Sequence, residues 1–262
     1  MRKIKPFNFA DILISLHYLM NDRHHAAWMA RPIIRFPGLF RLPFCKRHLN
    51  IAFIQKRSLL HILWSLDSTV KNQNHVVSYD LSAQILQVVM QAAADKKLTN
   101  IEIQQGLAES LPFADQSFDI VISRYSAHHW HDVGKALREV KRVLRPGGKV
   151  IFMDVVSPGH PVLDIYLQTV EVLRDTSHVR NYSPGEWLSL FTEGGLVINE
   201  VTSDRLYLEF SSWVARMRTP AHFATAIREF QKLASDGVIN HYAIQADGSF
   251  TSDIMMIVAV RD

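Results

Sequence analysis

The stretch that decides the fold is Gly106–Trp130, which reads GLAESLPFADQSFDIVISRYSAHHW. It leads from a turn into Phe118–Ser123, a continuous apolar run of the kind that is buried in a parallel sheet. The following stretch, Ala136–Asp154, reads ALREVKRVLRPGGKVIFMD and combines an amphipathic helix, a Pro-Gly-Gly turn and a second apolar strand. This order predicts helices packed on a mostly parallel sheet.

The same alternation continues on both sides of this stretch. Strands are expected at 76–79, 101–105, 118–123, 149–154, 196–204 and 253–260, and helices at 82–94, 131–144, 162–174, 186–192 and 221–233. The fold class is therefore α/β, a Rossmann-like, doubly wound and mostly parallel sheet. Ligands of such sheets bind beyond the carboxyl ends of the strands, here at Asp80 and at residues 106–109, 123–129 and 154–157.

Residues 1–70 form an atypical basic segment without a sustained period of two or 3.6, and residues 71–262 are expected to form the main domain. Residues 1–75 hold 12 Lys/Arg and 3 Asp/Glu, a balance of +9. Residues 76–262 hold 17 Lys/Arg and 22 Asp/Glu, a balance of −5, so the net charge of the chain is +4. A basic arm could bind nucleic acid. Its positive charges are scattered among aromatic residues and prolines, however, so we expect no nucleic-acid partner.

Composition also limits the compartment. The single Cys45 excludes an internal disulfide framework and suits a reducing cytoplasm. No apolar run approaches about 20 residues, so no membrane span is expected. Polar residues interrupt the apolar segment after the basic start, which disfavours a cleavable signal. The sequence predicts a cytoplasmic protein and leaves its oligomeric state open.

Asp80 is the first candidate binding residue. It ends the expected strand at 76–79, where nucleotide-binding folds present a carboxylate that accepts hydrogen bonds from the two ribose hydroxyls. The alternative is a purely structural role, in which Asp80 caps the helix that begins near Ser82.

Two segments carry a family resemblance when taken together: AESLPFADQSFDIVIS at 108–123 and ALREVKRVLRPGG at 136–148. They resemble class I S-adenosylmethionine-dependent methyltransferases, in the group that contains the ubiquinone/menaquinone C-methyltransferases and the malonyl-carrier O-methyltransferase of biotin synthesis. The resemblance covers about 76–262 and extends to a small uncharacterised enterobacterial member. It implies the sheet order 3-2-1-4-5-7-6 with strand 7 antiparallel, the cofactor S-adenosyl-L-methionine, and methyl transfer to a small-molecule acceptor.

The resemblance also assigns cofactor contacts. Asp80 would bind the ribose, Leu107 and Ala108 would flank the adenine, and Ser123 would end the strand whose backbone meets the methionine portion. Glu109 would lie near the adenine amino group or cap the turn. The remaining expected contacts with cofactor or acceptor are Arg124 and Tyr125.

Methyl transfer to an acidic carbon or a hydroxyl releases a proton, and His128 or His129 is the candidate general base. The alternative is that both histidines pack the loop and cap the next helix. A metal site is not expected, because adjacent residues rarely converge on one ion. Asp154 is expected to be a strand end rather than a catalytic acid. Candidate acceptor contacts are Tyr166, His178, Arg180 and Tyr182.

The family's first strand and its glycine-rich loop are not recognisable. Gly38 is the only glycine in residues 1–75. Either the protein is divergent, or residues up to about 67 are translated from a shifted frame, in which Leu63-Trp64 stands where the family has Cys-Gly. A divergent protein would bind its ligand in another way. The frame shift predicts a chain that lacks its central first strand and binds S-adenosylmethionine weakly or not at all.

Two other classes of function are compatible with a sheet of this kind. A non-catalytic scaffold derived from a methyltransferase remains the alternative. A nicotinamide-dependent oxidoreductase is disfavoured, because the chain has no Gly-x-Gly-x-x-Gly string and no Tyr-x-x-x-Lys pair.

Overall fold

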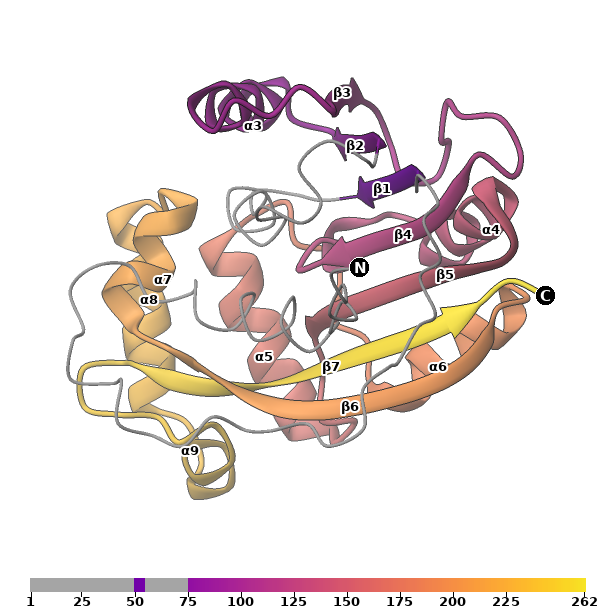
Figure 1. The fold of residues 1–262 in the computed structure, drawn as a ribbon. Coiled ribbons are helices and arrows are strands. Elements are labelled where there is room, and N and C mark those ends of the chain that lie inside the picture. Colours follow the sequence, from indigo (N-terminus) through magenta and orange to yellow (C-terminus); the bar gives the residue numbers. More distant parts are fainter. Residues whose placement is uncertain (1–49, 55–74) are drawn as a thin grey trace, which may run out of the picture.

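The computed structural model describes residues 50–54 and 75–262. Its centre is one seven-stranded sheet in the order β3-β2-β1-β4-β5-β7-β6 (Figure 1). The strands are β1 (Asn50–Ile54), β2 (His75–Asp80), β3 (Ile101–Gln105), β4 (Phe118–Arg124), β5 (Leu144–Val155), β6 (Val197–Leu208) and β7 (Phe250–Val260). The first five strands pair in parallel, and β7 is antiparallel to both β5 and β6. The predicted sheet order and the antiparallel seventh strand are confirmed.

The structure corrects the expectation that the first strand is missing. β1 lies at the centre of the sheet, where Ala52 pairs with Val77 of β2 and Val121 of β4. All of its residues except the first are buried. The sequence did not reveal this strand, because the apolar run Ile51–Ile54 has only four residues and no usable period, and polar and basic residues follow it.

β1 precedes the boundary that we placed near residue 70, so the sheet takes at least one strand from the N-terminal part of the chain. Residues 55–74 connect β1 to β2, and their 20 residues exceed the dozen or so that a parallel crossover requires. This connection contains no glycine. Leu63-Trp64, and with it the reading-frame hypothesis, lies outside the described residues.

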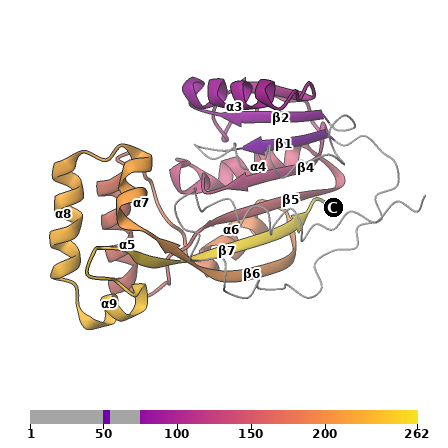
Figure 2. The same ribbon diagram turned by 60° about the vertical axis from the view of Figure 1, so that its left-hand side comes forward.

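Helices cover the sheet on both faces and at one end (Figure 2). α3 (Ala83–Asp95) packs its buried residues against one face, and α4 (Val133–Val143) with α6 (Pro184–Glu193) packs against the other. A third cluster lies beside the carboxyl ends of β4 and β5. This cap consists of α5 (Pro161–Arg174), α7 (Phe210–Met217), α8 (Ala221–Lys232) and α9 (Asp236–Tyr242).

Most predicted elements are present with boundaries shifted by a few residues. The apolar face expected on α4 is fully buried, and Trp187 and Trp213 belong to the core. On α3, Leu86, Val89, Ala92 and Ala93 are buried, whereas Met90 is exposed. The short helices α7 and α9 were missed. No helix among residues 50–54 and 75–262 is long and apolar enough to cross a membrane.

Candidate functional site

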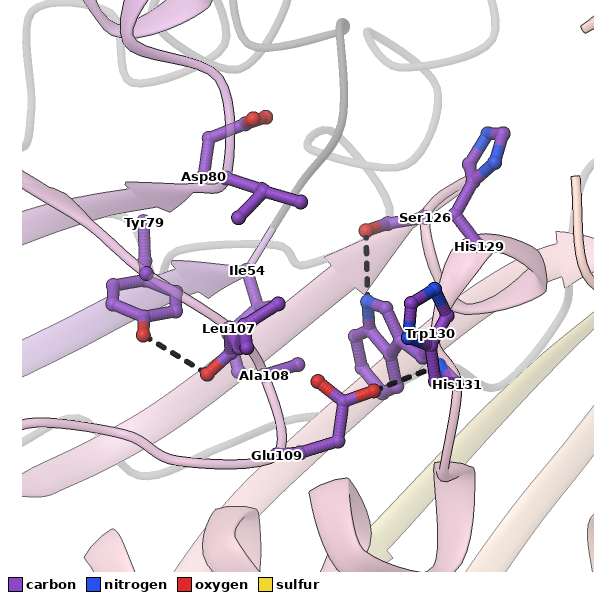
Figure 3. A pocket seen from close by; sticks show the side chains of 12 residues that line it. Ile54, Tyr79, Asp80, Leu107, Ala108, Glu109, Ser126, His129, Trp130 and His131 are labelled. Atoms are coloured by element: carbon purple, nitrogen blue, oxygen red, sulfur yellow. Dashed lines mark hydrogen bonds between the residues drawn. The ribbon is translucent and has the colours of Figure 1, made fainter. Parts of the chain in front are cut away.

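A pocket opens at the carboxyl ends of β1 and β2, between the loops that follow β3 and β4 (Figure 3). It has a volume of about 480 Å³, its open mouth included. The lining side chains come from four separate segments of the chain, and they are Ile54, Tyr79, Asp80, Leu81, Gly106, Leu107, Ala108, Glu109, Ser126, His129, Trp130 and His131. Five of the nine predicted site residues therefore meet in one place: Asp80, Leu107, Ala108, Glu109 and His129.

Asp80 ends β2 and forms one wall of the pocket (Figure 3). Its side chain is almost fully buried, and its Oδ1 accepts a hydrogen bond of 2.7 Å from the backbone N–H of Ser82. Ser82 is the N-cap residue of α3, but its own side chain makes no capping hydrogen bond. Asp80 thus holds the turn before α3 and borders the pocket at the same time.

Tyr79 and Gly106 form the adjoining wall. The Tyr79 hydroxyl donates a hydrogen bond of 2.9 Å to the backbone oxygen of Leu107 (Figure 3). Burial, with Glu109 and Glu139 nearby, raises the pKa of Tyr79 to about 12, so the hydroxyl keeps its proton at neutral pH. A Cβ atom at position 106 would lie 2.1 Å from this hydroxyl, so only glycine fits the present packing. Tyr79 was not predicted to line the pocket, because all residues of β2 after His75 are buried and no pattern in the sequence sets Tyr79 apart.

The loop after β3 supplies an apolar surface and a carboxylate. Leu107 is half exposed and Ala108 is buried. The Oε1 atom of Glu109 accepts hydrogen bonds from the backbone N–H groups of His131, at 2.8 Å, and Asp132, at 3.2 Å. Glu109 therefore joins this loop to the start of α4, which is the capping role that we considered beside adenine binding.

The loop after β4 closes the pocket on the opposite side. The indole Nε1 of Trp130 donates a hydrogen bond of 3.3 Å to Ser126 Oγ (Figure 3). Trp130 is buried between this loop and Phe152 of β5, with an edge-to-face ring contact. Its packing fixes the segment that carries His129 and His131 into the pocket. Sequence analysis did not identify Ser126, Trp130 or His131 as lining residues.

Comparisons with known proteins agree with this architecture. A family model described as a methyltransferase domain matches residues 63–152. The chain is 64% identical to the uncharacterized protein YafE of Escherichia coli K12, over 72% of this chain and 91% of YafE. The crystal structure of YcgJ from Bacillus subtilis superposes with a TM-score of 0.75 at 32% identity, covering 83% of this chain and 94% of that one. YcgJ is named an uncharacterized methyltransferase.

The chain belongs to the class I S-adenosylmethionine-dependent methyltransferases. A demethylmenaquinone methyltransferase from Chlorobaculum parvum is also similar, at 40% identity over 88 residues. That match covers 34% of each chain, so it extends the family relationship without bearing on the acceptor.

The other predicted cofactor contacts of this methyltransferase lie outside the pocket. Ser123 and Arg124 end β4 and are buried. Tyr125 follows with a left-handed backbone, φ 49°, and packs against the cap. The Arg124 guanidinium lies 4.8 Å from the centre of the Tyr125 ring. Burial lowers the pKa of Arg124 and raises that of Tyr125 to about 12.

His128 does not line the pocket either. Its ring lies next to that of His129, with 4.2 Å between the ring centres, and its Nδ1 is 2.6 Å from Oδ1 of Asp154. Asp154 is the strand end that we expected, and it is also the partner of a candidate catalytic histidine. The sequence places these two residues 26 positions apart, and only the parallel pairing of β4 with β5 brings them together.

The candidate acceptor contacts are dispersed. Tyr166 is buried in the cap, with its ring stacked on that of Phe230. Arg180 pairs with Glu186 at 3.0 Å, and its guanidinium lies 5.7 Å from the Tyr182 ring centre. Two of the four approach the histidines of the β4 loop. The ring centre of His178 lies 5.6 Å from that of His128, and the backbone N–H of Arg180 donates a hydrogen bond of 3.1 Å to the His128 carbonyl oxygen.

Proposed function

We propose that this protein transfers a methyl group from S-adenosyl-L-methionine to a small-molecule acceptor. The observation that supports this proposal is the pocket at the carboxyl ends of β1 and β2, where a buried carboxylate borders an apolar slot within a class I methyltransferase sheet. Ligands of this sheet type bind at that end.

The residues present fit the adenosine part of that cofactor. Asp80 offers carboxylate oxygens to a pair of ribose hydroxyls, and such charge-assisted hydrogen bonds are stronger than neutral ones. Leu107, Ala108 and Ile54 offer apolar surface to a flat ring. The glycine at 106 keeps the Tyr79 side of the slot free of a Cβ atom.

When bound, S-adenosyl-L-methionine supplies a methyl group that its sulfonium already activates. The protein then has to hold the two reactants in line, exclude water and receive a proton, and orientation alone can account for much of the rate. His128 and His129 are our candidates for the proton acceptor. The side chains of Arg124 and Tyr125, with the backbone at Ser123, are our candidates for contacts beyond the adenosine half.

Isothermal titration calorimetry with S-adenosyl-L-methionine tests the proposal. The glycine-free connection after β1 leads us to expect saturable but weak binding, with a dissociation constant above about 10 μM. Asp80→Asn should weaken binding at least tenfold, because it removes the charge that strengthens the ribose hydrogen bonds. Asp95→Asn, an exposed carboxylate at the end of α3, is the matched control and should leave binding unchanged.

The outcomes separate the alternatives. A low-micromolar constant in the wild type would contradict the expected weakness and leave the function standing. An absence of any binding would favour the non-catalytic scaffold. Replacing Leu63-Trp64 with Cys-Gly tests the frame hypothesis, which predicts a gain in affinity.

A further inference from the structure

The contact between His128 and Asp154 indicates which ring nitrogen of His128 carries the hydrogen. The Asp154 carboxylate accepts backbone hydrogen bonds from Ala127, at 2.9 Å, and Val155, at 2.8 Å, besides its 2.6 Å contact with His128 Nδ1. Its side chain is 4% exposed. Backbone N–H groups donate to both oxygens of this side chain, so Nδ1 of His128 is assigned as a third donor, and the lone pair of the neutral ring lies on Nε2.

Backbone hydrogen bonds hold residue 128 in place, and Asp154 orients its ring. The carbonyl oxygen of His128 accepts hydrogen bonds from the N–H groups of Val179, at 2.9 Å, and Arg180, at 3.1 Å. Its Nε2 makes no hydrogen bond with any residue in 50–54 or 75–262. An oriented imidazole with one nitrogen held by a carboxylate and the other available is the arrangement of a general base.

His129 differs from His128 in this respect. Its Nδ1 donates a hydrogen bond of 3.0 Å to the backbone oxygen of Ser177, and its Nε2 lies 3.8 Å from Oδ2 of Asp175. Both ring nitrogens thus face oxygen atoms of the protein. His129 is better placed to shape the pocket wall than to receive a proton.

His178 provides a neutral neighbour. Its Nε2 donates to the side-chain oxygen of Gln168 at 2.9 Å, an oxygen that also accepts the N–H of Asn181. Burial lowers the pKa of His178 to about 4, which leaves Nδ1 as a buried acceptor without a hydrogen-bond partner. Such an atom requires a donor from a water or a ligand.

The charged groups around His128 favour its protonated form. Burial would lower its pKa, but Asp154, with Glu171 in support, raises it above the ordinary value despite the opposing charge of Arg174. The neutral His178 adds no positive charge at neutral pH. An imidazole in this environment binds a proton more readily than a free one.

We propose that His128 is the general base of this methyltransferase and Asp154 its positioning residue, and that the acceptor is therefore a nucleophile with a proton to lose, an acidic carbon or a hydroxyl. This inference rests on the proposed function. The acceptor's proton passes to Nε2, and its electron pair forms the bond to the methyl carbon. The bond from that carbon to sulfur breaks, its electron pair stays on sulfur, and the imidazolium later releases the proton to water.

The first test measures the histidine tautomers and pKa values by ¹⁵N NMR of histidine-labelled protein. His128 should be the Nδ1–H tautomer and should titrate above about 6.5, the ordinary value. His241 of α9, whose Nε2 lies 2.8 Å from a carboxylate oxygen of Asp253 in β7, is an internal control of the opposite tautomer. Asp154→Asn should lower the pKa of His128 and leave His241 unchanged. An Nε2–H tautomer at His128 would overturn the proposal.

The second test measures transfer of labelled methyl groups from S-adenosyl-L-methionine to two kinds of acceptor. Catechol and 2,4-pentanedione must lose a proton, whereas pyridine and dimethyl sulfide have none to lose. Transfer should be confined to the first pair. His128→Gln should lower the kcat for transfer to catechol and 2,4-pentanedione at least tenfold. Asp154→Asn should lower this kcat and shift its pH profile, and Asp154→Glu should restore part of the activity.

Transfer to pyridine or dimethyl sulfide, or to no acceptor while the cofactor binds, would overturn the inference. The calorimetric titration separates this failure from failure of the proposed function, because neither variant alters a residue of the adenosine pocket. His241→Gln, in a histidine–aspartate pair of the cap, should leave transfer unchanged.

Discussion

The two ends of the sheet differ in how their polar groups are paired. At the amino end, Asp119 accepts hydrogen bonds from the backbone N–H of Asn50, at 2.8 Å, and from Arg145, at 2.6 Å. At the carboxyl end, the Oγ of Ser123 and the Nδ1 of His178 are buried and have no hydrogen-bond partner among residues 50–54 and 75–262. Stability alone favours full pairing. The two unpaired atoms at the carboxyl end border the loop that carries His128, so a partner from outside is expected there.

The largest effect should follow from breaking the paired end at Arg142. Its guanidinium donates five hydrogen bonds of 2.7–2.8 Å, to the backbone oxygens of Leu111 and Phe113 and to the carboxylates of Asp115 and Glu139. Arg142→Ala leaves these acceptors unpaired and should lower the free energy of unfolding by about 3 kcal/mol, measured by urea titration.

Arg138→Ala on the same helix is the control for Arg142, because Arg138 is exposed. It should change stability by less than about 0.5 kcal/mol. The histidine tautomers at the other end should be the same in both variants. If Arg142→Ala lowered the free energy of unfolding no more than Arg138→Ala does, the hydrogen bonds of Arg142 would not stabilise the fold.

Gly106→Ala tests the carboxyl end directly. The new methyl group would overlap the Tyr79 hydroxyl, so the ring must move and release its hydrogen bond to Leu107. We expect a stability loss of about 2 kcal/mol and at least tenfold weaker cofactor binding. Gly185→Ala, where no atom lies within 4 Å of the new methyl group, should change neither quantity.

A double variant sharpens the result at position 106. Tyr79→Phe removes the hydroxyl with which the new methyl group collides, so adding it to Gly106→Ala should restore part of the lost binding. Equal losses in the single and double variants would place the cause elsewhere than in this contact.

Much of the fold was predictable, because long apolar runs mark its strands and helices, and glycine and proline mark the turns between them. β4, α4 and β5 were each predicted from such patterns, and the sheet order followed from the family resemblance. β1 was not predicted. Its five residues form a strand because they pair with β2 and β4. These strands lie far away in the sequence, so the pairing produces no periodic pattern within β1 itself.

Residues of the site were predictable only where a side chain suited to binding follows directly on the end of an expected strand. Asp80 meets this condition, and so do the three residues of the loop Leu107–Glu109. These four residues line the pocket. Tyr79 and Trp130 line it through packing that depends on other elements. The partnership of His128 with Asp154 depends on the register between two strands, which spacing along the chain does not reveal.

Asp154→Asn should produce a smaller effect that depends on pH. The raised pKa of His128 means that the ion pair stabilises the fold fully below the unfolded pKa of about 6.5, and loses this contribution as pH rises through the folded pKa. The variant should lose about 2 kcal/mol at pH 6, and less at pH 9. Urea titrations of both proteins at the two pH values measure the difference. A loss that is the same at both would mean that His128 carries no extra proton in the folded state.

The smallest effect should come from Ser123→Ala, which tests the meaning of the unpaired end. Ser123 is 1% exposed, and its hydroxyl has no hydrogen-bond partner in the part of the chain that the structure describes, so burying it costs desolvation without a compensating bond. Alanine at this position should therefore change stability by less than about 0.5 kcal/mol or increase it slightly. If a ligand or water pairs with this hydroxyl when the cofactor is present, the variant should be less stable than the wild type only in its presence. Thermal unfolding with and without S-adenosyl-L-methionine distinguishes the two cases, since a loss in both would reveal a partner within the protein itself.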